Sequence, residues 1–217
     1  SGVYLLSYRV DEQTSHDVWS SLGSLIYNRQ QTERTLTVQV RVGSYELDNF
    51  HELRDDYSDY LSGISTVTLP LNDDSQALAQ IIWRETDRAY REAKQRYEKV
   101  KANVAVMAEA DDHAPDYSNA AVETYFEPAI TDNLFHEDEW IDRTKALSSV
   151  FKQNQDIQTG YASIKYEVLR KYFVNSDGTS IVQNCTSCLL YLNVEGQADD
   201  GMVLPLYHSY YAHTPDQ

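Results

Sequence analysis

The sequence has few positively charged residues for its size. Its 217 residues include 18 Lys and Arg against 34 Asp and Glu, which gives a formal net charge of −16. Nucleic acids and anionic membrane surfaces are recognised through clustered positive charge, so this balance argues against both as direct partners. No apolar run approaches the roughly 18 residues of a membrane span, and we therefore expect a soluble protein. Disorder is excluded by the 41% hydrophobic share and the 17 Tyr residues.

Glycine is also scarce, with eight residues in all. The sequence has no Gly-x-Ser-x-Gly nucleophile motif and no Gly-rich loop that could cradle a phosphate. Two His-Glu pairs, at His51 and His136, resemble the start of a zinc-peptidase helix, but neither is followed by a second His at the required spacing. His208 and His213 are five residues apart in a strand pattern, about 17 Å and too far for one metal ion. The sequence therefore predicts no catalytic, cofactor-binding or metal-ligating residue.

Cysteine is the rarest chemically reactive residue, with Cys185 and Cys188 in a C-x-x-C spacing. A redox-active pair of this spacing belongs at a strand-to-helix turn, whereas residues 188–194 have the pattern of a strand. A four-thiolate zinc site would need a second pair of cysteines. We predict incidental thiols, and a disulfide between the two or a metal half-site are the alternatives.

The first third of the chain predicts strands. Val3–Val10 is rich in β-formers. The polar residues 30–34 indicate a loop, so we expect a hairpin that pairs residues 18–29 with residues 35–42. Residues 44–63 are polar and aromatic, and we expect them to form a long excursion on the surface.

The strongest pattern predicts a helix over residues 75–106. Leu69–Ser75 supplies a proline and several N-cap candidates before it. Apolar residues then recur at spacings of three, four or seven, which is one face of a helix. We expect this face to pack on a sheet made by the C-terminal strands and residues 36–42. Its members are Leu78, Ile82, Ala89, Ala93, Tyr97, Val100 and Val104.

The other side of this helix is rich in charge. Residues 84–101 contain seven Lys and Arg and four Asp and Glu. Such a face indicates solvated i,i+4 ion pairs, here Asp87 with Arg91 and Glu92 with Arg96. A docking surface for an acidic partner is the alternative interpretation.

The second half of the chain predicts an irregular acidic stretch over residues 109–137 and then a helix over residues 138–154. The inner side of this helix is expected to carry Ile141, Leu147, Val150 and Phe151. After the helix the period changes to two, which predicts four strands. They span residues 161–174, 179–184, 188–194 and 202–211.

Two turns separate these strands, at Asn175–Gly178 and Asp199–Gly201, where Asn and Gly tolerate positive φ. The order of elements predicts an α+β fold, with a long helix and a shorter helix packed on a largely antiparallel or mixed β-sheet. We expect a single domain over residues 1–217.

Four segments of the chain carry a family resemblance. Arg41–Asn49 has the form RVG-x-x-x-LDN, and Leu69–Asp74 leads into Trp83–Tyr90 at the long helix. Tyr172–Thr179 has the form FVNS-(D/E)-GT, and Gln197–Met202 supplies the next turn. In this order the segments resemble TldD/PmbA-type proteins, a family also described as predicted modulators of DNA gyrase.

This resemblance implies an N-terminal α/β domain of a longer parent whose C-terminal, catalytic domain lies outside this chain. Family members are associated with zinc-dependent peptide cleavage and work as TldD–PmbA pairs. Their His-Glu-x-x-x-His zinc motif follows this domain in the TldD-type subunit, and the PmbA-type subunit lacks it. The resemblance therefore implies zinc in a TldD-like parent and places no catalytic residue in this chain. Ser1 and the polar stretch 212–217 also fit a domain of a longer protein.

We therefore expect a non-catalytic domain that contributes to dimer assembly and to the walls of a substrate chamber. Its expected partners are copies or relatives of the parent, in homo- or hetero-oligomers, and peptide substrates. The alternative is a stand-alone peptide- or glycan-binding module, indicated by tyrosines in polar segments: Tyr45, Tyr57, Tyr60 and Tyr117. The resemblance favours a cytoplasmic location, and a removed export signal would instead indicate an exported form.

Overall fold

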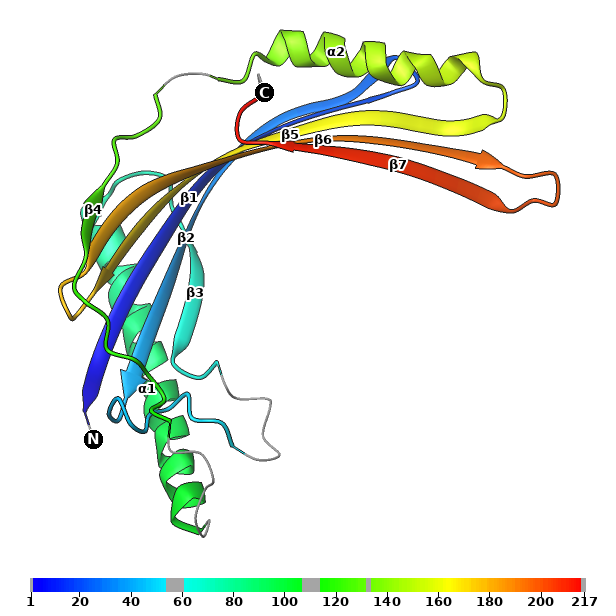
Figure 1. The fold of residues 1–217 in the computed structure, drawn as a ribbon. Coiled ribbons are helices and arrows are strands. Elements are labelled where there is room, and N and C mark those ends of the chain that lie inside the picture. Colours follow the sequence, from blue (N-terminus) through cyan, green and yellow to red (C-terminus); the bar gives the residue numbers. More distant parts are fainter. Residues whose placement is uncertain (1, 54–60, 107–113, 132–133, 216–217) are drawn as a thin grey trace. The chain divides into compact units, whose positions relative to one another are not determined.

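The computed structural model describes residues 2–53, 61–106, 114–131 and 134–215. Its elements follow in the order β1 (Val3–Ser21), β2 (Ser24–Val42), β3 (Ile64–Leu69), α1 (Ser75–Val106), β4 (Thr124–Phe126), α2 (Glu137–Ser149), η1 (Val150–Gln153), β5 (Ile157–Asn175), β6 (Ser180–Gln197) and β7 (Val203–Ala212) (Figure 1). The strands form one sheet in the order β3-β2-β1-β5-β6-β4, and β7 also pairs with β6. The α+β expectation is confirmed in this coarse form, although the sheet, rather than the long helix, dominates the fold.

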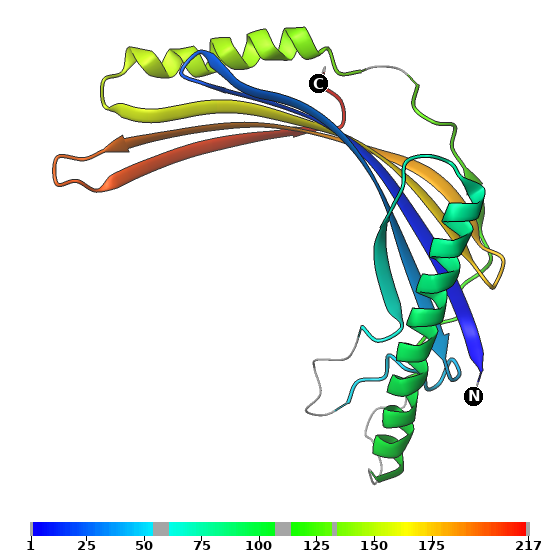
Figure 2. The same cartoon turned by 180° about the vertical axis from the view of Figure 1, so that it is seen from behind.

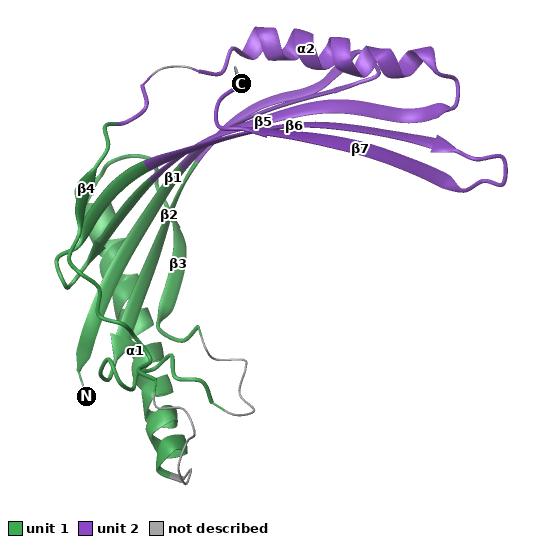
Figure 3. Ribbon diagram, in the orientation of Figure 1, with its two compact units in different colours: residues 1–12, 33–128, 171–183 green, residues 13–32, 129–170, 184–217 purple. Residues whose placement is uncertain are grey.

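The chain divides into two compact units, shown in different colours in Figure 3. Unit 1 comprises Ser1–Glu12, Glu33–Pro128 and Lys171–Gln183, and unit 2 comprises Gln13–Thr32, Ala129–Arg170 and Asn184–Gln217. The long strands β1, β2, β5 and β6 each contribute residues to both units. Each unit has its own cluster of buried hydrophobic residues and its own helix.

A two-residue turn at Leu22 and Gly23 joins β1 to β2. Both residues have positive φ, 46° and 78°, as a tight hairpin turn that matches the twist of its strands requires. The hairpin predicted between residues 18–29 and residues 35–42 is therefore wrong, because residues 24–29 and 35–42 belong to the same strand, β2, whose hairpin partner is β1.

The polar residues that suggested a loop lie inside β2. In unit 2, the hydroxyls of Thr14 and Thr32 are 3.0 Å apart across β1 and β2. In unit 1, Arg34 Nε donates a hydrogen bond to Glu12 at 2.7 Å. Cross-strand polar pairs of this kind stabilise a sheet without the apolar alternation that marks a strand in a sequence.

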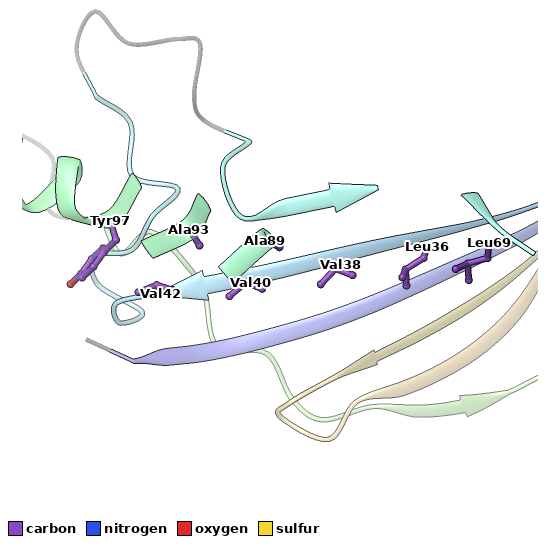
Figure 4. Close-up of a cluster of buried hydrophobic side chains, with 8 residues drawn as sticks. All are labelled: Leu36, Val38, Val40, Val42, Leu69, Ala89, Ala93 and Tyr97. Atoms are coloured by element: carbon purple, nitrogen blue, oxygen red, sulfur yellow. The ribbon is translucent and has the colours of Figure 1, made fainter. Parts of the chain in front are cut away.

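Helix α1 covers one face of the strands in unit 1 (Figure 2) and has the bounds that the sequence predicts. Its N-terminus is capped by Asp74, whose Oδ1 accepts hydrogen bonds from the backbone N–H groups of Gln76 at 2.9 Å and Ala77 at 3.1 Å. The buried cluster beneath the helix is drawn in Figure 4: Leu36, Val38, Val40, Val42, Leu69, Ala89, Ala93 and Tyr97.

The predicted stripe of α1 is confirmed for most of its length. Ala89, Ala93, Tyr97 and Val100 are buried, and Leu78 and Ile82 are partly buried against the same cluster, but Val104 is 39% exposed. The strand residues of the cluster come from β2 and β3, with β1 residues packed beside them. The C-terminal strands, which we expected under the helix, supply no member of this cluster among the described residues.

Helix α2 covers one face of unit 2, and the short helix η1 continues it (Figure 1). Its buried face consists of Trp140, Thr144 and Ser148 rather than the predicted apolar set, and Val150 is 54% exposed. The polar members of this face are partnered, since the hydroxyls of Thr144 and Ser20 are 2.9 Å apart. The cluster under the helix consists of Val18, Phe135, Trp140, Ile164, Tyr166 and Cys188.

The C-terminal strands are fewer and longer than predicted. The strands predicted over residues 179–184 and 188–194 are one strand, β6, which begins at Ser180, and β7 follows it in an antiparallel hairpin. Both predicted turns are confirmed, with positive φ at Gly178 (104°) and Gly201 (87°). The described part of the chain contains no helix with both the length and the apolar character needed to cross a membrane.

Candidate functional site

The RVG-x-x-x-LDN segment ties the end of β2 to the loop that follows it. Asp48 is fully buried, and its carboxylate accepts hydrogen bonds from Arg41 and from the hydroxyl of Tyr4. Its second oxygen accepts the backbone N–H of Phe50 at 2.6 Å. Burial and the neighbouring Asp48 carboxylate raise the pKa of Tyr4, which therefore stays a donor in this cluster.

Asn49 and Gly43 complete this closed loop. Asn49 Oδ1 accepts the backbone N–H of Val42 at 2.7 Å, and its amide donates to the carbonyl of Ser62 at 2.8 Å. Gly43 has a φ of 129°, and a Cβ there would lie 2.4 Å from the carbonyl oxygen of Leu47. Only glycine fits at this close approach.

The expected surface excursion over residues 44–63 is therefore wrong for its first part. Asp48, Asn49 and Leu53 are buried, and a further strand, β3, begins at Ile64. Two of the tyrosines singled out there, Tyr57 and Tyr60, lie outside the described residues. The sequence suggested an exposed loop because the buried groups in it are polar.

Aromatic rings and a second carboxylate surround Arg41. Its guanidinium lies 4.4 Å from the ring centre of Phe50 and 4.3 Å from that of Tyr117. Asp116 accepts the backbone N–H of Asp48 at 2.8 Å and contacts His51 Nδ1 at 2.7 Å. These groups face one another rather than solvent, so the segment serves the fold and offers no free reactive group.

Arg96 of α1 is also buried, beside the loop that contains Asp48 and His51. It is 1% exposed and donates a hydrogen bond to the backbone carbonyl of His51 at 3.4 Å. The predicted solvated pair with Glu92 is wrong for this residue, because a buried guanidinium needs acceptors inside the protein. By contrast, Arg91 pairs with Asp87 at 2.6 Å on the wet side of the helix, as predicted.

The strand face opposite α2 presents a row of aromatic rings. Side chains alternate along a strand, so the residues beside the buried Val18 and Ile164 point away from the helix. Ring centres are 5.4 Å apart between Tyr27 and Trp19, and 5.0 Å apart between Trp19 and Tyr161. Tyr191 and Tyr207 extend this aromatic row at 5.9 Å and 6.1 Å. The rings come from β2, β1, β5, β6 and β7 in turn, and no helix covers them within unit 2 among the described residues.

A groove of about 300 Å³ runs beside the aromatic row. We call it the aromatic groove, and it is lined by Asp17, Val18, Trp19, Tyr27, Tyr161, Ser163, Ile164, Lys165, Leu189 and Tyr191. Pockets with mostly apolar walls and a few polar groups are typical of ligand sites. The aromatic groove is therefore the best-formed candidate site of unit 2.

Two polar groups in the aromatic groove have no partner among the described residues. The side chain of Asp17 forms no hydrogen bond or ion pair with them, and burial raises the pKa of its carboxyl group. The indole Nε1 of Trp19 is buried without an acceptor. Lys165 also lines the groove, but its ammonium group is held by Glu167 at 2.5 Å.

Strand β7 forms an apolar edge of unit 2. Residues Val203–Ala212 include no Asp, Glu, Lys or Arg, and the outward edge of this strand has no partner strand among the described residues. Most of its large side chains are exposed: Val203, Leu204, Leu206, Tyr207, Tyr210 and Tyr211. An exposed edge strand of this composition is a site for association with another chain.

The residues considered for chemistry from the sequence do not come together. His136 is exposed where α2 begins, and His51 is held by Asp116. Cys185 is exposed and Cys188 is buried, both as free thiols, because residues three apart on a strand point to opposite faces. Within the described ranges, no three His, Cys, Asp or Glu side chains are close enough to hold a metal ion. The described residues therefore do not fit a zinc site.

One histidine that the sequence did not single out lies in a second depression of unit 2. His16 stacks on Phe135 with ring centres 5.0 Å apart, and burial lowers the pKa of its imidazole. With His136 and the acidic first turn of α2, it lines an open hollow of about 690 Å³. Three acidic residues of α2 line this hollow, Glu137, Asp138 and Glu139.

No protein-family model matches the sequence, and no curated protein matches it. Several solved structures do match, and two of them are putative modulators of DNA gyrase. The protein from Thermotoga maritima matches with a TM-score of 0.52 and 12% identity, and the protein from Bacteroides thetaiotaomicron with 0.56 and 11%. The chain has the fold of one part of these gyrase-modulator proteins.

The match covers 98% of this chain but 40% and 41% of the two neighbours, so the chain spans about two-fifths of their length. At this low identity the likeness concerns the fold. The resemblance inferred from the four sequence segments is confirmed at that level. In this chain the four segments include two turns and the buried hydrogen bond between Arg41 and Asp48. None of the segments contributes a residue to the aromatic groove.

Proposed function

We propose that this chain is a non-catalytic domain of a longer TldD/PmbA-like peptidase, in which it contributes to dimer assembly and to the walls of a substrate chamber. The observation that carries the proposal is the uncharged, exposed edge strand β7. Two copies of a chain with a net charge of −16 repel each other unless they meet through an uncharged surface. An antiparallel edge strand is also self-complementary about a two-fold axis.

Association through β7 is tested by the molar mass of the chain in solution. Leu206 is 70% exposed on β7, and Leu206→Glu would place two like charges at the interface of a pair. We expect the variant to be monomeric by light scattering at a concentration where the unchanged chain forms dimers. Leu71→Glu, at a residue 49% exposed in unit 1, is the matched control and should keep the dimer. A chain that is monomeric at all concentrations would contradict assembly through this domain alone.

The aromatic groove supports the part of the proposal that concerns the chamber wall. It offers apolar and hydrogen-bonding surface on strands rather than on loops, which suits contact with extended peptides. The same observation favours the second candidate, a stand-alone peptide- or glycan-binding module. The reading frame beyond Gln217 distinguishes them, because a following His-Glu-x-x-x-His supports a TldD-like parent.

We propose that zinc, where a TldD-like parent binds it, is held outside residues 1–217. The purified chain should contain substoichiometric zinc and cleave no unfolded casein. Stoichiometric zinc that is lost in Cys185→Ser or Cys188→Ser would contradict this and point to the C-x-x-C pair.

We also propose protein partners rather than nucleic acid. At a net charge of −16, the chain should not retard duplex DNA at moderate salt. Micromolar binding of DNA under these conditions would contradict the proposal.

A further inference from the structure

The aromatic groove combines hydrophobic walls with one carboxylate, that of Asp17, which forms no ion pair with the described residues. Trp19, Tyr27, Tyr161 and Tyr191 line it from four strands, and Asp17 lies two residues from Trp19 on the same face of β1. Aromatic faces attract cations through their quadrupoles, and the attraction grows when the cation is removed from water. Rings and a carboxylate together are therefore suited to a cation that has an apolar stem.

The basic groups near Asp17 do not neutralise it by contact. Lys165 Nζ is 2.5 Å from Glu167, and Gln13 donates to the same carboxylate at 2.7 Å. Arg29 and His16 are the other basic groups whose charge reaches Asp17, and neither forms an ion pair with it among the described residues. A half-buried carboxylate without a partner is unfavourable in the free protein, and a bound cation would relieve that cost.

We propose that the aromatic groove binds a lysine or arginine side chain of an extended peptide, with the cationic group on Asp17 and the methylene stem against the rings. This inference rests on the proposed contact between the open face of unit 2 and peptides. Trp19 lines the same groove and its buried N–H has no acceptor among the described residues, so its environment changes when a ligand occupies the groove.

Two other occupants fit the groove less well. An acidic side chain would meet Asp17 with the same charge, and an uncharged apolar side chain would cover Asp17 without compensating it. An oligosaccharide could stack on the rings, but it carries no cation for the carboxylate. The charge of Asp17 is thus the feature that selects among ligands.

Titration of the full chain with short blocked peptides tests this inference. The probes are acetyl-Ala-Ala-Lys-Ala-Ala-amide and the same peptide with norleucine or Glu in place of Lys. The readout is the indole N–H resonance of Trp19 in proton–nitrogen correlation spectra. Trp19→Phe identifies this resonance among those of the three tryptophans. We expect the Lys peptide to shift it in a saturable way and the Glu peptide to leave it unchanged.

Variants separate the charge from the fold. Asp17→Asn keeps the shape of the side chain and should weaken the Lys peptide at least about ten-fold, which corresponds to roughly 1.4 kcal/mol. Because Asp17 has no partner to lose, this variant should unfold no more easily than the unchanged chain. Asp142→Asn, at an exposed residue of α2 on the other face of unit 2, is the matched control and should bind normally.

Equal binding of the Lys and norleucine peptides, or unchanged binding by Asp17→Asn, would overturn the inference while leaving peptide binding by this face intact. A shift produced by a neutral oligosaccharide such as chitotriose, without one from the Lys peptide, would overturn it in favour of glycans. Absence of any peptide binding would remove both the inference and the chamber-wall proposal. Assembly through β7 would then be judged separately by Leu206→Glu.

Discussion

In unit 1, a helix of 32 residues closes one face of the strands, and the buried carboxylates Asp48 and Glu85 are each held by several donors of the same unit. In unit 2, a helix of 13 residues closes one face, and the carboxylate of Asp17 on the other face forms no hydrogen bond or ion pair with the described residues. Partnered polar groups stabilise a fold, whereas unpartnered ones reduce its stability unless a ligand binds. We therefore propose that the held carboxylates of unit 1 stabilise the fold and that the open face of unit 2 binds a ligand.

The two units also differ in where charge lies. The helix of unit 1 carries ion pairs on its wet side, among them Arg88–Glu92 and Arg91–Asp87. The edge strand of unit 2 has no charged side chain at all. Charged surfaces keep acidic proteins apart and uncharged ones allow contact, so variants in the two regions should have different effects.

The largest effect is expected from Ala93→Asp in the core of unit 1. Ala93 is fully buried in the cluster under α1, and a carboxylate there would have neither water nor a partner. We expect a loss of about 4 kcal/mol or more in the free energy of unfolding, measured by urea denaturation. Ala102→Asp, at an exposed position of the same helix, is the control and should change it by less than about 1 kcal/mol.

Removal of the buried carboxylate of unit 1 should have the next largest effect. Asp48→Ala leaves Arg41, Tyr4 and the N–H of Phe50 without their acceptor. We expect a loss of about 3 kcal/mol or more in the free energy of unfolding, with no change in peptide binding by unit 2. Asp73→Ala, at an 84% exposed partner of Arg34, should cost less than about 1 kcal/mol. An equal loss of unfolding free energy in the two variants would show that the hydrogen bonds of Asp48 stabilise the fold no more than an exposed ion pair does.

The pH dependence of stability provides a smaller effect in the same unit. Glu85 is 4% exposed, and the hydrogen bond from Ser65 at 2.7 Å, with Arg84 nearby, lowers the pKa of its carboxyl group. A lowered folded-state pKa stabilises the protein above the unfolded value of about 4.3, and this contribution is lost as the pH falls through the folded pKa. Glu85→Gln should therefore reduce the free energy of unfolding by about 1–2 kcal/mol at neutral pH.

The difference between Glu85→Gln and the unchanged chain should shrink when unfolding is measured at about pH 4 and below. Glu92→Gln, at a residue whose side chain is 40% exposed, is the control. A constant difference across this pH range would mean that the ionised form of Glu85 is not what stabilises unit 1.

The elements that could be predicted from the sequence are those set by local patterns. Helix α1 follows from its apolar period and the cap at Asp74, and the later hairpin follows from the Asn175–Gly178 turn. The hairpin of β1 and β2 was misplaced because its polar stretches are paired across strands. The buried state of Arg96 was missed because its acceptor, the carbonyl of His51, is 45 residues away in the chain.

The candidate site was beyond sequence reasoning for a related reason. The aromatic groove takes between one and four residues from each of four strands, and only the register of the sheet brings them together. The sequence does contain local indications of the groove. Asp17 and Trp19 share one face of β1, and Tyr161 and Lys165 share one face of β5. Asp17 has no partner among the described residues because Lys165 pairs with Glu167 instead, and this pairing is visible only in the three-dimensional structure.

The smallest effect on stability is expected at Arg91, on the wet side of α1. Its side chain is 76% exposed and pairs with Asp87 at 2.6 Å. Because solvent screens this ion pair, Arg91→Ala should lower the free energy of unfolding by less than about 0.5 kcal/mol. Thermal unfolding measures this, and molar mass in solution shows whether assembly survives. If the melting temperature is unchanged but the longer parent no longer assembles, the basic side of α1 docks an acidic partner. Unit 1 would then also have a binding surface, and the division of roles between the units would fail.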